Sequence, residues 1–281
     1  MEVIVAKNAG YCFGVKRAID IATETLTKHS GKIIYSLGEI IHNPQVVDRL
    51  LSRGLRVVKS VDDIEKGSVV IISAHGRSER DIEEIKNKDC IIVNATCPYV
   101  KLPQGIIKRL SGEGYFIIVL GDRDHPEVKG LISYAKGSNI MVVDENFNGI
   151  GSMKSTKVGV VAQTTQNREH FKRLINRVIE QNFDEVRIFN TICDATDIRQ
   201  EETIEIAKEV DIMVVIGGKN SANTKRLFEI SRGYCNRVFH IETAEELKRR
   251  DFSGIKRVGV TAGASTPNDI IESVIKRLKS F

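Results

Sequence analysis

Three cysteines stand in matching surroundings along the chain. Cys12, Cys97 and Cys193 each follow an apolar, strand-like segment with an asparagine shortly before the cysteine, in VIVAKNAGYC, IIVNATC and VRIFNTIC. Three thiolates that meet at one centre suit a soft metal ion or an iron–sulfur cluster. Structural zinc normally takes four protein ligands, whereas this pattern supplies three. A four-iron–four-sulfur cluster held by three cysteines has one open iron, where a substrate oxygen can bind.

The plain alternative is that these are three buried cysteines that gene duplication has copied. Cys90 and Cys235 have no partners in the repeated pattern, and we interpret them as ordinary buried or incidental residues. No two cysteines form a C-x-x-C pair, so neither a thioredoxin-like motif nor a zinc ribbon is indicated.

Polar residues gather in loops that follow the other apolar segments. Each loop type occurs three times, as EIIHNP, DRDHPE and GKNSAN and as SAHG, QTT and AGAS. Imidazole, hydroxyl and amide groups of this kind can surround an oxyanion such as phosphate. Glu127 is a carboxylate beside a matched histidine and a proline, where it can act as a proton donor. The candidate residues of these loops are His42, His75, His125, Glu127, Thr164, Thr165, Ser221, Asn223 and Ser265.

The elements that must position these residues form a repeat of about 90 residues. Each cysteine is followed by a helical segment and an apolar strand (KIIYSLG, YFIIVLG, IMVVIGG), and further strands and helices follow in the same order. This alternation predicts an α/β fold of three similar units with mostly parallel sheets, whose ligands gather at the carboxyl ends of the strands. We expect a pseudo-threefold trefoil around a central cluster.

The repeat also predicts the domain boundaries. The first unit covers residues 13–96, the second 97–192 and the third 193–281. The third unit lacks its closing strand, and we expect the N-terminal strand within residues 1–12 to supply it.

Composition limits the classes of protein that need to be considered. The chain has 281 residues, 41% of them hydrophobic and 28% charged, which is typical of a globular protein. No apolar stretch approaches the roughly 20 residues of a membrane span and no signal peptide is indicated, so we expect a cytoplasmic protein with reduced cysteines and no membrane partner. The net charge of +5 is mild, and without a basic stripe with interleaved aromatics we expect no nucleic-acid binding.

Eight motifs in order resemble the LytB/IspH family. They are YCFGVKRA, HNP, SAHG, ATCP, HPE, QTT, KNS-x-N-T and TAGAS, and they extend the match from residue 8 to about residue 270. Members of this family are 4-hydroxy-3-methylbut-2-enyl diphosphate reductases of the methylerythritol phosphate route to isoprenoids. The resemblance implies a trefoil of three α/β domains around an oxygen-sensitive cluster.

The resemblance also implies roles for individual residues. Cys12, Cys97 and Cys193 look like ligands of a 4Fe-4S cluster with one open iron, which binds the substrate hydroxyl. Two electrons and two protons then remove that oxygen as water and give isopentenyl or dimethylallyl diphosphate. Glu127 looks like the proton source, with Thr164 bonding the substrate oxygen and His125 beside them. The implied diphosphate pocket contains His42, His75, His125, Ser221, Asn223 and Ser265. A ferredoxin or flavodoxin would suit the mild positive charge as electron donor.

Two departures from the family pattern stand out. Ala222 replaces the second of two serines, which removes a hydroxyl donor but keeps a backbone N–H. After ATCP the chain reads YVKLPQG, with Lys101, Leu102, Pro103 and Gln104 in place of a charged run. Because Pro103 and Gly105 are unfavourable inside a helix, we expect the helix after Cys97 to start late.

Two other functions use the same residues. A non-enzymatic iron–sulfur sensor could bind a phosphate ligand, although a sensor needs no proton donor such as Glu127 beside the open iron. A zinc-dependent hydrolase could use the same cysteines. Colour distinguishes the last alternative, because an intact cluster is brown and a zinc protein is colourless.

Overall fold

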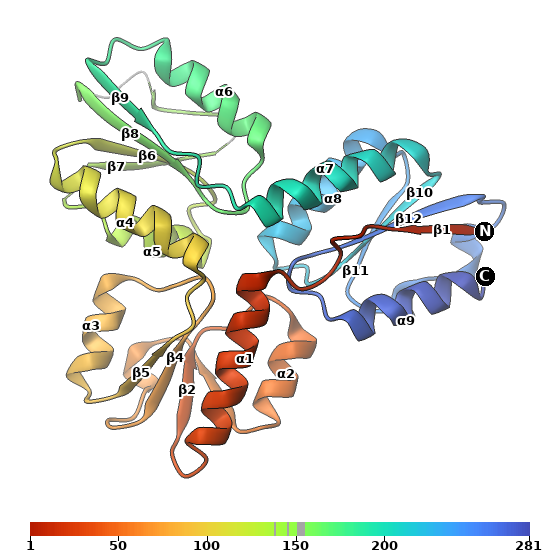
Figure 1. The fold of residues 1–281 in the computed structure, drawn as a ribbon, viewed down its shortest axis with the longest axis horizontal. Coiled ribbons are helices and arrows are strands. Elements are labelled where there is room, and N and C mark those ends of the chain that lie inside the picture. Colours follow the sequence, from red (N-terminus) through yellow and green to blue (C-terminus); the bar gives the residue numbers. More distant parts are fainter. Residues whose placement is uncertain (138, 145, 151–154) are drawn as a thin grey trace. The chain divides into compact units, whose positions relative to one another are not determined.

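The structure is a computed structural model that describes residues 1–137, 139–144, 146–150 and 155–281 (Figure 1). Within this part of the chain, the strands form three sheets of four strands each. Contacts divide the chain into two compact units. The first unit contains Met1–Lys16, His42–Asp48 and Asp194–Phe281, and the second contains Arg17–Ile41 and Arg49–Cys193.

One sheet of the second unit is built from the early part of the chain. Its strands are in the order β3-β2-β4-β5, and all neighbours run parallel. The bounds are β2 Ile34–Leu37, β3 Leu55–Val58, β4 Val69–Ile72 and β5 Ile91–Asn94. The helices of this stretch are α1 Phe13–Lys28, α2 Pro44–Leu51 and α3 Glu79–Asn87, with a 3-10 turn η1 at Val61–Asp63.

The other sheet of the second unit repeats this plan. Its order is β7-β6-β8-β9, again parallel throughout. The bounds are β6 Phe116–Leu120, β7 Ile140–Val143, β8 Lys157–Ala162 and β9 Glu185–Ile188. Its helices are α4 Pro98–Gly112, α5 Pro126–Ser133 and α6 Arg168–Ile179.

The sheet of the first unit joins the two ends of the chain. Its order is β1-β12-β10-β11, and β1 pairs in parallel with β12 from Glu2 opposite Arg257 to Val5 opposite Val260. The bounds are β1 Glu2–Val5, β10 Ile212–Ile216, β11 Val238–Ile241 and β12 Arg257–Ala262. The helices are α7 Asp194–Glu209, α8 Ala222–Tyr234 and α9 Asn268–Lys279, with 3-10 turns η3 Ala244–Glu246 and η4 Arg249–Phe252.

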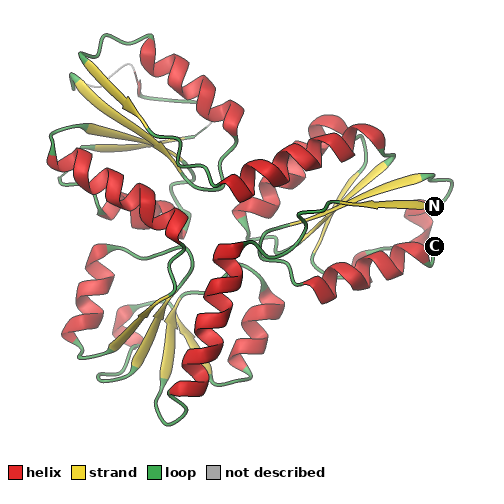
Figure 2. Ribbon diagram, viewed as in Figure 1, coloured by secondary structure: helices red, strands yellow, loops and turns green. Residues whose placement is uncertain are grey.

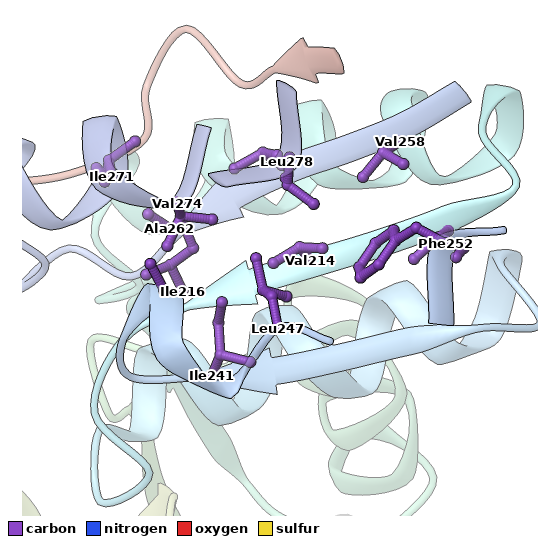
Figure 3. Close-up of a cluster of buried hydrophobic side chains, with 13 residues drawn as sticks. Val214, Ile216, Ile241, Leu247, Phe252, Val258, Ala262, Ile271, Val274 and Leu278 are labelled. Carbon is purple, nitrogen blue, oxygen red and sulfur yellow. The ribbon is translucent and has the colours of Figure 1, made fainter. Parts of the chain in front are cut away.

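These sheets are buried on both faces, which explains their continuous apolar strands. In the first unit, helices cover both sides of the sheet (Figure 2). Val214 and Ile216 of β10 pack with Leu278 of α9 in one cluster, whereas Met213 packs with Ala207 of α7 in another (Figure 3). Alternate residues of a strand point to opposite faces, so an apolar residue is needed at every position.

The predicted α/β class with three similar parallel-sheet units is confirmed. The trefoil arrangement and the three-domain boundaries stay predictions. No helix of the described residues is both long enough and apolar enough to span a membrane.

The prediction of a late start for the helix after Cys97 is wrong. Cys97 is the N-cap of α4, and Pro98 occupies its first turn, where proline is favoured. Pro103 lies inside the helix and is itself buried. Helix α4 also buries Ile107 and Leu110 in one hydrophobic cluster with Ile117 of β6. This packing outweighs the hydrogen bond that Pro103 removes.

Candidate active site

The three cysteines occupy the same place in their sheets. Each follows the edge strand that pairs with the strand leading into the SAHG, QTT or AGAS loop. Their backbone N–H groups donate to carbonyl oxygens of these loops: Cys12 to Ala264 at 3.1 Å, Cys97 to Ala74 at 3.0 Å and Cys193 to Thr164 at 3.0 Å. Equivalent hydrogen bonds therefore place each thiol beside a polar loop at the carboxyl end of its sheet.

The thiols suit cluster ligation. All three cysteines are in the thiol form rather than in disulfides, and all three are partly exposed. The Val15 N–H lies 3.5 Å from Cys12 Sγ and donates to it, and such hydrogen bonds stabilise a thiolate that binds iron. Cys12 lies in the first unit, and Cys97 and Cys193 lie in the second. Among the described residues, no three His, Cys, Asp or Glu side chains are grouped so that they could hold a metal ion, and the three-cysteine ligand set stays a prediction.

A buried carboxyl group lies in the second unit. Glu127, in the first turn of α5, is 1% exposed. Thr164 donates to it twice, from its backbone N–H to Oε1 at 2.7 Å and from its hydroxyl to Oε2 at 2.8 Å. Burial raises the pKa of Glu127 to about 7, and the two Thr164 hydrogen bonds oppose that rise. A carboxyl group with this pKa can both donate and accept a proton near neutral pH.

Two histidines meet beside this carboxyl group. The rings of His75 and His125 are 5.6 Å apart between centroids and perpendicular. His125 is the N-cap of α5, and its Nδ1 accepts the N–H of Glu127 at 3.2 Å. Because Nδ1 is an acceptor, a neutral His125 carries its proton on Nε2, which remains a donor. The second unit thus brings His75, His125, Glu127 and Thr164 together.

The first unit holds the remaining candidates. Ser265 Oγ donates to the carbonyl oxygen of His42 at 3.0 Å, so the AGAS loop binds the HNP loop directly. Ser221 is the N-cap of α8 and accepts the N–H of Thr224 at 3.3 Å. Asn223 is 7% exposed, and its Nδ2 has no hydrogen-bond partner among the described residues.

The start of α8 therefore offers donor groups, among them an Asn223 amide that has no acceptor among the described residues. Ala222 is the first helical residue, and the first N–H groups of a helix have no partner within it. A buried amide donor and a helix N-terminus together favour an anion.

The chain matches the family described as LytB protein over residues 3–279. It belongs to that family. A curated relative from Geobacter sulfurreducens is 48% identical over 282 residues, covering 100% of this chain and 98% of its own. A relative from Aquifex aeolicus is 45% identical, covering 100% and 97%. Both carry the name 4-hydroxy-3-methylbut-2-enyl diphosphate reductase. The predicted family is confirmed, and this LytB chain is an enzyme.

Two solved structures resemble the LytB chain. The E-1-hydroxy-2-methyl-but-2-enyl-4-diphosphate reductase from Plasmodium falciparum is 28% identical, with a TM-score of 0.93 over 99% of this chain and 88% of that one. A structure described as (E)-4-hydroxy-3-methyl-but-2-enyl diphosphate reductase is 44% identical, with a TM-score of 0.72 over the whole of both chains. Both are described as reductases, in agreement with the curated relatives.

The structure changes which residues are equivalent in the loops before α2, α5 and α8. His125 and Ser221 are N-caps, but His42 precedes its helix by one further residue. The side chain at the matching place is Asn43, which is 1% exposed and accepts the Val46 N–H at 3.0 Å. Aligning HNP with DHP on their prolines would have shown from the sequence that Asn43, and not His42, matches His125.

A second missed residue is Gln45. Gln45 follows Pro44 as Glu127 follows Pro126, so each is the second residue of its helix. Asn223 is likewise the second residue of α8. Oε1 of Gln45 is buried without a hydrogen-bond partner among the described residues. The three LytB repeats thus carry Gln45, Glu127 and Asn223 at one helical position, and Glu127 alone can release a proton.

The two cysteines outside the repeat have ordinary surroundings. Cys235 is 5% exposed and packs with Ala207 and Met213. Cys90 packs against the cluster that includes Ile72 and Ile85.

Proposed function

We propose that this chain reduces 4-hydroxy-3-methylbut-2-enyl diphosphate to isopentenyl diphosphate and dimethylallyl diphosphate, in the methylerythritol phosphate route. The substrate's hydroxyl oxygen leaves as water, and two electrons and two protons are consumed for each molecule of product. The names of full-length relatives at 45–48% identity support this substrate.

One observation carries the proposal. Thr164 binds Glu127 through its N–H and hydroxyl, and its own carbonyl oxygen accepts the N–H of Cys193. A single residue therefore links a buried acid to a predicted cluster ligand. An acid adjacent to a redox centre is what reductive removal of a hydroxyl group requires, because the leaving oxygen must be protonated.

Cys12, Cys97 and Cys193 would hold a 4Fe-4S cluster, which when bound supplies electrons and one iron without a protein ligand. Glu127 holds the proton at its carboxyl oxygens, and Thr164 fixes these oxygens in place. Burial of Glu127 limits the contact of its carboxyl group with bulk water, which favours proton transfer to a bound substrate over exchange with solvent. His125 is held by the Glu127 N–H and presents Nε2–H as a further donor.

The diphosphate would bind the polar residues that the repeated loops supply. His75 and a neutral His125 with its Nε2–H offer imidazole groups, Ser221, Asn223 and Ser265 are neutral donors, and the Ala222 N–H replaces a side-chain hydroxyl. His42 contributes from the loop that Ser265 holds. Six residues with donor groups and a helix N-terminus suit a ligand with several charged oxygens.

The electron donor is expected to be a ferredoxin or flavodoxin, since an acidic protein complements a net charge of +5. The experiment is anaerobic reconstitution, iron and sulfide analysis, and incubation of 4-hydroxy-3-methylbut-2-enyl diphosphate with reduced ferredoxin. Formation of both five-carbon diphosphates by a brown protein supports the proposal. Cluster and phosphate binding without turnover would indicate the sensor, and a colourless zinc protein would indicate the hydrolase.

A further inference from the structure

An arginine that follows one cysteine binds the loop that precedes another. Arg17 lies near the start of α1, shortly after Cys12. Its Nη1 donates to the carbonyl oxygens of Ala95 at 3.3 Å and Thr96 at 3.1 Å, the two residues directly before Cys97. Arg17 and this loop belong to the same unit, so the contact is internal to it.

The same arrangement occurs in the other unit. Arg199 lies on α7, the helix after Cys193, and is 6% exposed. Its Nη2 donates to the carbonyl oxygen of Gly10 at 2.9 Å, two residues before Cys12, and its Nη1 donates to that of Ala195 at 2.8 Å.

A carboxylate on the same helix binds the other end of the Cys12 loop. Glu202 accepts the backbone N–H groups of Lys7 at 2.5 Å and Asn8 at 3.0 Å, and the Asn8 side chain at 3.2 Å. Arg199 and Glu202 are one helical turn apart, so they face the same loop. Helix α7 therefore fixes the segment between β1 and Cys12 at both ends.

The third loop has a different support. Helix α4 follows Cys97, and Leu102 and Pro103 stand where α1 and α7 carry their arginines. The loop before Cys193 is held by Thr191, whose hydroxyl donates to the Ala162 carbonyl at 2.6 Å and accepts the Ala162 N–H at 2.8 Å. The loops before Cys97 and Cys12 are thus held by arginine side chains, whereas the loop before Cys193 is held by the neutral side chain of Thr191.

We propose that Arg17 and Arg199 are positioning residues that hold the Cys97 and Cys12 loops ready for cluster binding, and that their charges raise the reduction potential of the cluster. The inference rests on the proposed function. A guanidinium is rigid and always charged, so its hydrogen bonds fix a loop well. Reduction adds negative charge to a cluster, and a nearby positive charge stabilises the reduced form.

The first test uses the full chain without its cluster. Backbone hydrogen exchange is measured in Arg17→Met, Arg199→Met and Lys16→Met, the last of which removes an exposed charge next to Arg17. Arg17→Met is expected to speed exchange about tenfold or more in the Cys97 loop and not in the Cys12 loop. Arg199→Met is expected to do the reverse, so each variant controls for the other. Exchange like that of Lys16→Met in both loops would overturn the positioning role.

The second test uses the reconstituted protein. Midpoint potential and the rate of cluster loss in air are measured for Arg17→Met and Arg17→Lys. Arg17→Met is expected to lower the potential and speed cluster loss, whereas Arg17→Lys keeps the charge and should keep a potential near that of the parent chain. An unchanged potential in Arg17→Met would overturn the electrostatic role. If the parent chain takes up no iron and sulfide, both the proposed function and the effect on the cluster potential are wrong. The hydrogen-exchange result still decides whether Arg17 and Arg199 hold the cysteine loops in place.

Discussion

Thr164 and Glu127 are joined by two hydrogen bonds that end on different carboxyl oxygens, at 2.7 and 2.8 Å. Both donors favour the ionised carboxylate, yet burial outweighs them and raises the pKa to about 7. The pair therefore keeps an acid in fixed orientation that exchanges its proton near neutral pH.

Glu127→Gln is expected to retain the cluster and substrate affinity and to lose about 10²–10⁴-fold in turnover. The amide keeps the shape and one acceptor oxygen, but its N–H protons are too weakly acidic to be transferred. Turnover is measured anaerobically with saturating reductant, beside iron content and substrate titration. Turnover like that of the parent chain would show that protons arrive by another route.

The raised pKa predicts a pH dependence of stability. Glu127 has a pKa of about 7 when folded against 4.5 as its ordinary value, so between these pH values the folded chain binds more protons than the unfolded chain. The contribution of Glu127 to the free energy of unfolding should therefore fall as pH rises from about 4.5 to 7, by about 1.4 kcal/mol per unit of pKa difference as an upper limit.

Urea unfolding of the full chain at several pH values, compared with Glu127→Gln, measures this contribution. The difference between the two proteins should change across that range and level off on both sides. Glu24→Gln, an exposed substitution, is the control and should track the parent chain. A constant difference between parent and Glu127→Gln would show that the carboxyl group does not titrate there.

Replacement of single cysteines by serine should separate ligands from ordinary residues. Cys12→Ser, Cys97→Ser and Cys193→Ser should each lose most of the cluster absorbance and iron, because a hydroxyl is a poorer iron ligand than a thiolate. Cys90→Ser and Cys235→Ser are the matched controls and should remain brown. Equal iron content in all five variants would contradict the ligand assignment.

Asn223→Ala should weaken diphosphate binding about ten- to a hundredfold, since a hydrogen bond to a charged group contributes about 1.5–3 kcal/mol. Binding of the alcohol without its diphosphate should barely change. Anaerobic titration of both ligands measures this, with Asn220→Ala as an exposed control in the same loop. An equal loss for both ligands would mean that Asn223 does not contact the diphosphate.

Local sequence patterns predicted much of the fold and many of the candidate site residues. The alternation of apolar strands with helices predicted three parallel-sheet units, because a strand buried on both faces must be apolar throughout. The spacing of Cys12, Cys97 and Cys193 marked equivalent strand ends, and the eight motifs indicated the family that the comparisons confirm.

Other features depend on residues far apart in the chain, and only the tertiary structure decided them. The helix through Pro103 forms because α4 packs on β6, which a local propensity does not register. The pKa of Glu127 depends on its burial and on Thr164, and the supports of the cysteine loops depend on Arg17 and Arg199 reaching backbone carbonyls elsewhere in the chain. A sequence displays periodicity and residue type, whereas desolvation and long-range hydrogen bonds exist only once the chain has folded.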